Sequence, residues 1–148
     1  MKNFKYVVDN GRFVYITDEL GRVKKAIMED VDFATKGRQQ DFQQHTKNIK
    51  DGKPDDHGGH IFRNEWGGLS EQINYFSQNA IQNKPGGDWF KMEQAISNFK
   101  KANPNTKIKM EVEFNFNGNS KRPTSADVDV YVNGQKNNIL SKVEIPNP

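Results

Sequence analysis

Apolar and polar residues alternate with a period of two in the last third of the chain. Every second residue from 108 to 116 is apolar, and residues 128, 130 and 132 repeat the pattern as valines. Successive side chains of a strand point to opposite faces, so this spacing predicts paired strands with one buried face. A turn at Asn133-Gly134 then leads to a last strand around 139–145, which completes an antiparallel sheet.

The N-terminal region has shorter β-rich runs. Residues 4–8 and 12–17 are joined by an Asn10-Gly11 pair, which suits a tight hairpin turn. A third run at 22–28 follows a turn that places Gly21 where a positive φ is favoured. The three runs predict a three-stranded meander.

Helical spacing is clearest between residues 88 and 101. Four large apolar residues form one stripe there: Trp89, Met92, Ile96 and Phe99. Asp88 can cap the N-terminus, and two lysines precede Pro104 at the other end. The amphipathic segment 69–80 also favours a helix, and the polar, glutamine-rich segment 38–50 favours a short exposed one.

Composition limits the protein to a small set of classes. The 148 residues predict one domain, 1–148, and only 33% of them are apolar. Neither a membrane-spanning run nor an apolar N-terminal signal is present, so we expect no membrane insertion. Without cysteine, disulfides and thiolate zinc sites are excluded, and a catalytic base must be a histidine or a carboxylate. The net charge of +3 permits a nucleic-acid partner without proving one.

The segment 51–68 concentrates chemistry in a glycine-rich stretch. It holds five glycines and Pro54 around Asp55, Asp56, His57 and His60, and we expect a shaped loop. Phosphodiester cleavage needs a base, a cation at the phosphate and positioning donors. An imidazole with a pKa near ~6.5 suits the base, and the two glycines before His60 would let a phosphate approach.

A transition-metal site is an alternative for the same segment. His57 and His60, with Asp55 and Asp56 nearby, could bind zinc, because imidazole and carboxylate both suit that ion. A hydrolytic zinc site normally has a third ligand, and His45 is the remaining histidine.

The order of residues along the chain resembles a known family of enzymes. The segments that carry the resemblance are Asp55-Asp56-His57-Gly58-Gly59-His60, Trp66-Gly67-Gly68, 73–79, Asn83 and 89–93, with 15–22 upstream and 119–125 downstream. Together they resemble the DNA/RNA non-specific endonuclease family of ββα-metal (His-Me finger) nucleases. Within it, they are most similar to the branch found as C-terminal toxin domains of bacterial polymorphic toxins.

The resemblance implies a fold and a set of site residues. The fold would be α+β, a ββα-metal nuclease core with an antiparallel sheet and few helices. His60 would be the general base and Asn83 the sole protein ligand of Mg²⁺, with Mn²⁺ as a possible substitute; Mg²⁺ keeps several waters. Glu93 would hold the waters of the metal, and Asn74 and Gln78 would hydrogen-bond the loop and the helix start.

Two departures from the family pattern concern the charged groups and the metal ligand. Many relatives have an arginine beside the base, where this chain has Gly58-Gly59. Arg63 is the first candidate to supply the missing phosphate contact, followed by Lys121, Arg122 and Arg38. The link from Asn83 to the helix is about two residues longer than usual in the family, which makes Asn79 the alternative ligand.

These observations predict a Mg²⁺-dependent endonuclease acting on DNA, RNA or both with little base specificity. The resemblance further implies a secreted toxin domain, delivered into target bacterial cells as part of a larger protein and neutralised by a cognate immunity protein. Competing hypotheses are a catalytically inactive binding module of the same fold, using the Lys121-Arg122 loop, and a zinc hydrolase.

Overall fold

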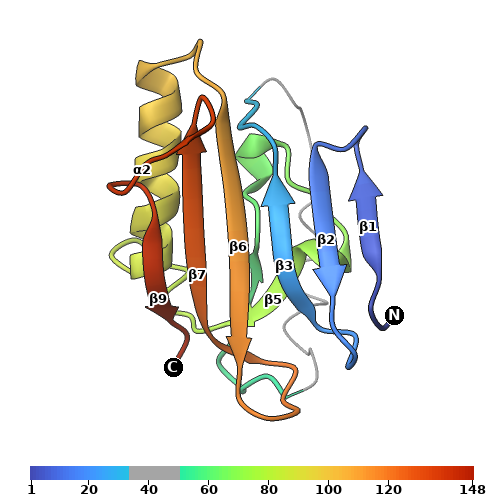
Figure 1. Ribbon diagram of the computed structural model, residues 1–148. Coiled ribbons are helices and arrows are strands. Elements are labelled where there is room, and N and C mark those ends of the chain that lie inside the picture. The colour runs from blue at the N-terminus through green and yellow to red at the C-terminus, as the bar shows by residue number, and fades with distance from the viewer. Residues whose placement is uncertain (34–50) are drawn as a thin grey trace.

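The computed structural model describes residues 1–33 and 51–148, and an antiparallel sheet dominates them (Figure 1). The sheet has seven strands in the order β1-β2-β3-β6-β7-β8, with β9 also paired to β7. Their bounds are Lys5–Val8 (β1), Phe13–Thr17 (β2), Val23–Met28 (β3), Ile108–Phe116 (β6), Pro123–Val132 (β7), Gln135–Lys136 (β8) and Lys142–Pro146 (β9).

The N-terminal meander and the C-terminal strand pair are both confirmed. Asn10 and Gly11 adopt positive φ angles of 55° and 86° in the first turn, as a tight hairpin requires. The long hairpin runs from the pair Ile108 and Val132 to Phe116 and Pro123. Strand β3 pairs directly with β6, so the two regions form one sheet.

The last strand is shorter than the sequence predicts. Strand β9 covers Lys142–Pro146, whereas Ile139 precedes it and is 82% exposed. The side-chain oxygen of Asn137 accepts hydrogen bonds from the backbone N–H groups of Ile139 and Leu140. This local bonding turns the chain before the strand can begin.

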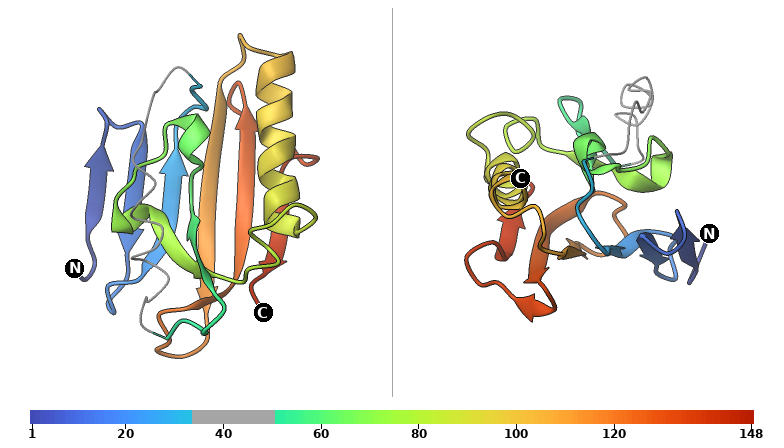
Figure 2. Two further views of the ribbon diagram at one scale, coloured as in Figure 1. Left: turned by 180° about the vertical axis from the view of Figure 1, so that it is seen from behind. Right: turned by 90° about the horizontal axis from the view of Figure 1, so that it is seen from above.

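A second layer covers one face of the sheet. It contains a two-stranded ribbon, β4 (His57–His60) with β5 (Tyr75–Gln78), and the helix α2 (Asp88–Ala102). Figure 2 shows the ribbon and the helix side by side on the same face of the sheet. Trp89, Met92 and Ile96 are buried there, as the apolar stripe predicts. The protein is therefore α+β, with the strand-strand-helix order of a ββα-metal core.

Two local predictions are wrong. Segment 69–80 is not a helix: it forms a 3-10 turn, Gln72–Asn74, followed by β5. All four residues of β5 are buried, so this strand has no period-two alternation. Segment 51–68 is more than a loop, because it includes β4 and a 3-10 turn at Asn64–Trp66. Segment 38–50 lies outside the described residues.

The start of α2 also differs from the prediction. Asp88 is the first helical residue, and Gly87 precedes it in an extended conformation without a side-chain cap. The backbone N–H of Trp89 instead donates to the side-chain oxygen of Gln82, 3.1 Å away. A residue outside the helix therefore satisfies one of the free N–H groups at its N-terminus.

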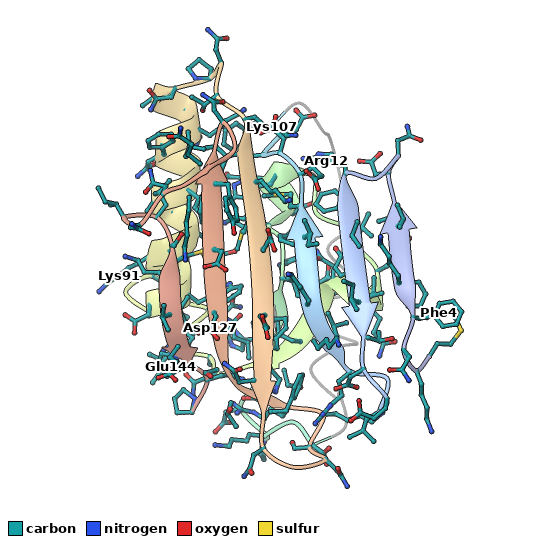
Figure 3. The ribbon with its side chains drawn as sticks, viewed as in Figure 1. Phe4, Arg12, Lys91, Lys107, Asp127 and Glu144 are labelled. Atoms are coloured by element: carbon teal, nitrogen blue, oxygen red, sulfur yellow. The ribbon has the colours of Figure 1, made fainter. Side chains whose placement is uncertain are left out.

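The other face of the sheet is polar. Asp127 lies on it in Figure 3, and Lys25 on β3 forms a 3.0 Å ion pair with Glu111 on β6. Charged side chains in this position let one face of an antiparallel sheet meet water. Among the described residues, no helix has the length and apolar character needed to cross a membrane.

Candidate active site

His60 is the last residue of β4 and lies opposite Tyr75 of β5. Directly opposite residues share one face of a ribbon, and the two rings are 4.6 Å apart between centroids. Burial, with a smaller contribution from the positive charge of Arg63, lowers the pKa of His60 to about 4. His60 is therefore neutral at physiological pH and can accept a proton.

Arg63 connects the ribbon to the helix. Its Nε lies 3.8 Å from Oε2 of Glu93 on α2, and its Nη1 lies 3.5 Å from Oε1 of Glu65. The guanidinium also lies over the ring of Phe90, 5.5 Å from its centroid. Because Arg63 acts electrostatically on His60 and pairs with Glu93, its positive charge lies near both predicted catalytic residues.

Glu93 is a buried carboxyl group with only 5% of its surface exposed. Burial raises its pKa to about 8, and the nearby charge of Arg63 only partly opposes that change. A carboxyl group in this state gains its negative charge more easily when a second cation is close. The position of Glu93 thus favours a bound cation.

Asn74 holds the loop that follows His60. Its side-chain oxygen accepts hydrogen bonds from the backbone N–H of Phe62 (3.1 Å) and from the hydroxyl of Tyr15 (2.9 Å). Its side-chain nitrogen donates to the carbonyls of Phe62 and Leu69, both at 2.9 Å. All the polar capacity of this fully buried amide is used to fix the loop that carries Arg63.

Gln78 has a different environment from the one we expected. It is 1% exposed, and its Oε1 forms no hydrogen bond within the described part of the chain. The helix start is bonded by Gln82 instead, a residue that no sequence motif singled out. A Cβ added at Gly59 would lie 1.9 Å from Oε1 of Gln78. Gly59 therefore makes room for a buried glutamine.

The two asparagine candidates for metal binding are not equivalent. The side-chain oxygen of Asn79 accepts hydrogen bonds from the backbone N–H groups of Ile81 (2.9 Å) and Gln82 (3.4 Å), so it is occupied in a turn. In Asn83, the nitrogen Nδ2 lies 3.1 Å from Nδ1 of His57. Its Oδ1 has no hydrogen-bond partner within 1–33 and 51–148, and it is the better available ligand.

The same contact places Asn83 at the far end of β4 from His60. His57 and His60 are three residues apart in a strand, about 10 Å at ~3.3 Å per residue. The structure thus brings Asn83 to the ribbon, and brings Arg63 and Glu93 to one another near His60.

The zinc alternative does not fit this geometry. Residues three apart in a strand point to opposite faces, so His57 and His60 cannot converge on one ion. Both carboxylate oxygens of Asp56 are bonded to Arg122. No group of three histidine or carboxylate side chains that could hold a metal occurs in the residues described, and His45 lies outside them.

The donors of Arg122 are bonded within the protein. This arginine is 7% exposed and forms a two-pronged ion pair with Asp56, at 2.7 and 2.9 Å. Its remaining donors bind the carbonyls of Asn147 and Pro148. Lys121 is exposed, with its Nζ 3.3 Å from the carbonyl of Leu20. Arg38 lies outside the described residues, which leaves Arg63 as the arginine placed at the site.

Comparison with known proteins decides the class of this site. Residues 2–134 match the family model of the DNA/RNA non-specific endonucleases. The chain belongs to this family. It is therefore an endonuclease that hydrolyses phosphodiester bonds of nucleic acid, and the alternative of an inactive binding module is not favoured.

The chain is also similar to curated bacterial proteins. It is 33% identical over 145 residues to the type VII secretion system protein EssD of Staphylococcus aureus, in strains USA300 and NCTC 8325. The match covers 95% of this chain and 23% of each EssD protein. The chain thus spans about a quarter of the length of these relatives.

Proposed function

We propose that this domain is a Mg²⁺-dependent nuclease with little base specificity, acting on DNA, RNA or both, in which His60 is the general base. The observation that carries the proposal is the neutral imidazole of His60 next to Arg63, which in turn pairs with Glu93. A neutral base, a phosphate-binding cation and a buried carboxyl group are the parts that hydrolysis of a phosphodiester requires.

In this mechanism, His60 takes a proton from a water molecule as the water oxygen attacks phosphorus. The new bond from the water oxygen to phosphorus forms in line with the bond from phosphorus to the 3′ oxygen. This second bond breaks, and the 3′ oxygen leaves with its electron pair. Arg63 binds a non-bridging phosphate oxygen through its guanidinium, which suits phosphate geometry. Contacts to the phosphate backbone carry no base information, so cleavage by this set would be non-specific.

The residues present fit a divalent ion with few protein ligands. Asn83 offers a side-chain oxygen without a partner among the described residues, and Glu93 offers a buried carboxyl group whose ionisation a cation would favour. Mg²⁺ suits such a site because it retains several waters and takes phosphate oxygens as ligands, and Mn²⁺ is a possible substitute. Asn83 would bind the ion directly and Glu93 through its waters. The bound ion would neutralise charge on the phosphate and on the leaving oxygen.

Incubation of the purified protein with plasmid DNA and with total RNA, in Mg²⁺ or EDTA, tests this proposal. Cleavage should require the metal and should fall at least 100-fold in His60→Ala, since a general base contributes roughly 10²–10⁴-fold. Tyr131→Ala, on the opposite face of the sheet, is the control and should cut like the wild type. Equal cleavage by His60→Ala, or intact nucleic acid with the wild type, would refute the proposal.

We also propose that the domain is the toxic part of a larger secreted protein, delivered into bacterial cells. The likeness to a quarter of a type VII secretion system protein supports this proposal. A nuclease inside its own producer requires an inhibitor, so a cognate immunity protein should bind it. Expression of the chain in a bacterial cytoplasm should stop growth, and the product of a neighbouring gene should restore it. The inactive His60→Ala chain, expressed at the same level, is the control. Normal growth of cells that express the wild-type chain at this level would contradict a toxic role.

A further inference from the structure

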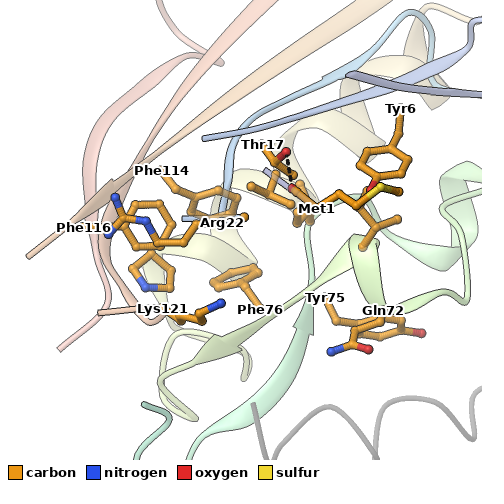
Figure 4. Close-up of a pocket in the computed structure, with 15 residues that line it drawn as sticks. Met1, Tyr6, Thr17, Arg22, Gln72, Tyr75, Phe76, Phe114, Phe116 and Lys121 are labelled. Atoms are coloured by element: carbon orange, nitrogen blue, oxygen red, sulfur yellow. Dashed lines mark hydrogen bonds between the residues drawn. The ribbon is translucent and has the colours of Figure 1, made fainter. Parts of the chain in front are cut away.

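A cavity of about 370 Å³ lies beside the ribbon, on the covered face of the sheet (Figure 4). This volume falls within the ~300–1,000 Å³ range of small-ligand sites. The ribbon contributes Tyr75 and Phe76, and the sheet contributes Tyr6, Phe114 and Phe116. Exposed side chains, Gln72 and Lys121, also line it, so the cavity is open to solvent.

Tyr75 connects the cavity to the proposed base. Its ring packs against His60 at 4.6 Å between centroids, and the same side chain lines the cavity. The residue is only 5% exposed, and Ser70 is the hydrogen-bonding neighbour of its hydroxyl. Tyr75 therefore forms a wall of the cavity and packs against His60 with the same ring.

The lining combines aromatic side chains with cations. Tyr6 and Phe116 are half-buried. Arg22, which forms a 2.8 Å ion pair with Asp18, lies over the ring of Phe116 with its guanidinium carbon 4.4 Å from the centroid. Lys121 adds a second positive charge at the cavity. Flat aromatic surfaces next to positive charge are the features with which proteins bind unstacked bases joined to phosphates.

We propose that this cavity binds one nucleobase of the substrate, adjacent to the phosphate that is attacked by the water molecule that His60 deprotonates. The inference rests on the proposed function and adds a substrate class to it. A base inside a duplex must first be unstacked and unpaired to enter such a pocket. The enzyme therefore binds single-stranded DNA or RNA, and unpaired loops, in preference to a duplex of the same sequence.

Steady-state cleavage of a single-stranded oligonucleotide and of its duplex tests the preference directly. The wild type should show a KM at least tenfold lower for the single strand. Tyr6→Ala should raise that KM roughly 5- to 100-fold, the range expected from the loss of one base-stacking ring, with a smaller effect on the duplex. Tyr6→Phe keeps the ring and should raise the KM for the single strand much less than Tyr6→Ala does. Tyr131→Ala removes a half-buried tyrosine from the other face of the sheet and should cut both substrates like the wild type. Equal KM values for both substrates, or no effect of Tyr6→Ala, would overturn the inference.

A binding experiment separates this inference from the proposed catalysis. In the His60→Ala protein, fluorescence anisotropy of a labelled single-stranded hexanucleotide, as DNA and as RNA, reports binding without cleavage. Val23 also lines the cavity, so Val23→Trp should fill it and weaken this binding at least tenfold. Thermal unfolding checks that the variant remains folded. If the wild type never cleaves but the hexanucleotide binds and Val23→Trp abolishes binding, the base site stands and the proposed function fails. If the wild type cleaves but Val23→Trp binds as before, the base site fails alone.

Discussion

Arg63 and Glu93 meet across the junction between the ribbon and α2, with 3.8 Å between Nε and Oε2. They belong to segments 30 residues apart in the chain. The pair is partly shielded from solvent, since the arginine side chain is 20% exposed and the glutamate side chain 7%. Arg63 is therefore our candidate for the cation that many relatives have beside the base, where this chain has Gly58-Gly59.

Replacement of Arg63 tests whether it is this cation. Arg63→Ala should lower kcat/KM for nucleic acid by roughly 10²–10³-fold, comparable with the loss of one donor that stabilises a transition state. Arg63→Lys should recover only part of the loss, because an ammonium group cannot form the two-pronged contact. The control is Lys91→Ala, which removes an exposed cation from α2, the helix that carries Glu93 (Figure 3). Equal losses in Arg63→Ala and Lys91→Ala would point to general electrostatics instead.

The pKa of His60 predicts the acid limit of activity. Because burial keeps the imidazole neutral down to about pH 4, kcat/KM should remain high at pH 5 and fall only as His60 becomes protonated. The same shift affects stability. Between pH 6.5 and about 4 the unfolded chain binds the proton that the folded chain does not, so the free energy of unfolding falls with falling pH. A pH–rate profile with a midpoint near 6.5 would show that His60 is not the neutral base described here.

Glu93 has the opposite pH dependence. Its pKa rises from 4.5 to about 8 on folding, so between these values the folded chain binds the extra proton. In the metal-free protein, the contribution of Glu93 to the free energy of unfolding is therefore fully present below pH 4.5 and is lost as pH rises through 8. In EDTA at pH 9, Glu93→Gln should raise Tm by several degrees, because each kcal/mol gained in the free energy of unfolding raises Tm by roughly 2–4 °C. In Mg²⁺, the same variant should lose activity. Glu113→Gln, on an exposed strand position, should change neither quantity.

Much of the fold was predictable because its strands follow the simplest patterns. The alternation in 108–116 and the stripe from Trp89 to Phe99 each report one buried face. The ribbon was not predictable in this way, because Tyr75 to Gln78 are buried on both sides and have no periodicity. His57-Gly58-Gly59-His60 likewise contains two glycines, which favour turns over strands.

The candidate site was likewise only partly predictable from the sequence. The order of His60, Asn83 and Glu93 identified the family, and family resemblance alone named their roles. Composition could not show that Arg122 is buried against Asp56 while Arg63 faces Glu93, because both depend on contacts between distant segments. Gln82 and Tyr75 were missed for the same reason.

The ion pair of Arg122 and Asp56 should matter for stability and not for chemistry. Arg122→Ala leaves Asp56 buried without its partner, and should lower the free energy of unfolding by roughly 3–5 kcal/mol. Lys136→Ala, which removes an exposed pair with Asp129, should cost at most about 1 kcal/mol. Activity per folded molecule should persist in both variants, as measured below the Tm of each. A specific loss of kcat in folded Arg122→Ala would restore this arginine to the phosphate site.

Gly59 and Gln78 should be energetically coupled. A methyl group at position 59 would lie 1.9 Å from Oε1 of Gln78 and 2.8 Å from its Cβ, so the buried glutamine must shift. Gly59→Ala should therefore destabilise the ribbon by roughly 1–3 kcal/mol, the usual cost of overpacking. Gln78→Gly in the same chain removes both Oε1 and Cβ and so frees the space, and the double variant should be more stable than the sum of the two single effects predicts. Chemical denaturation of all four proteins measures the coupling. Strict additivity would mean that the glycine is needed for another reason, such as close approach of the substrate.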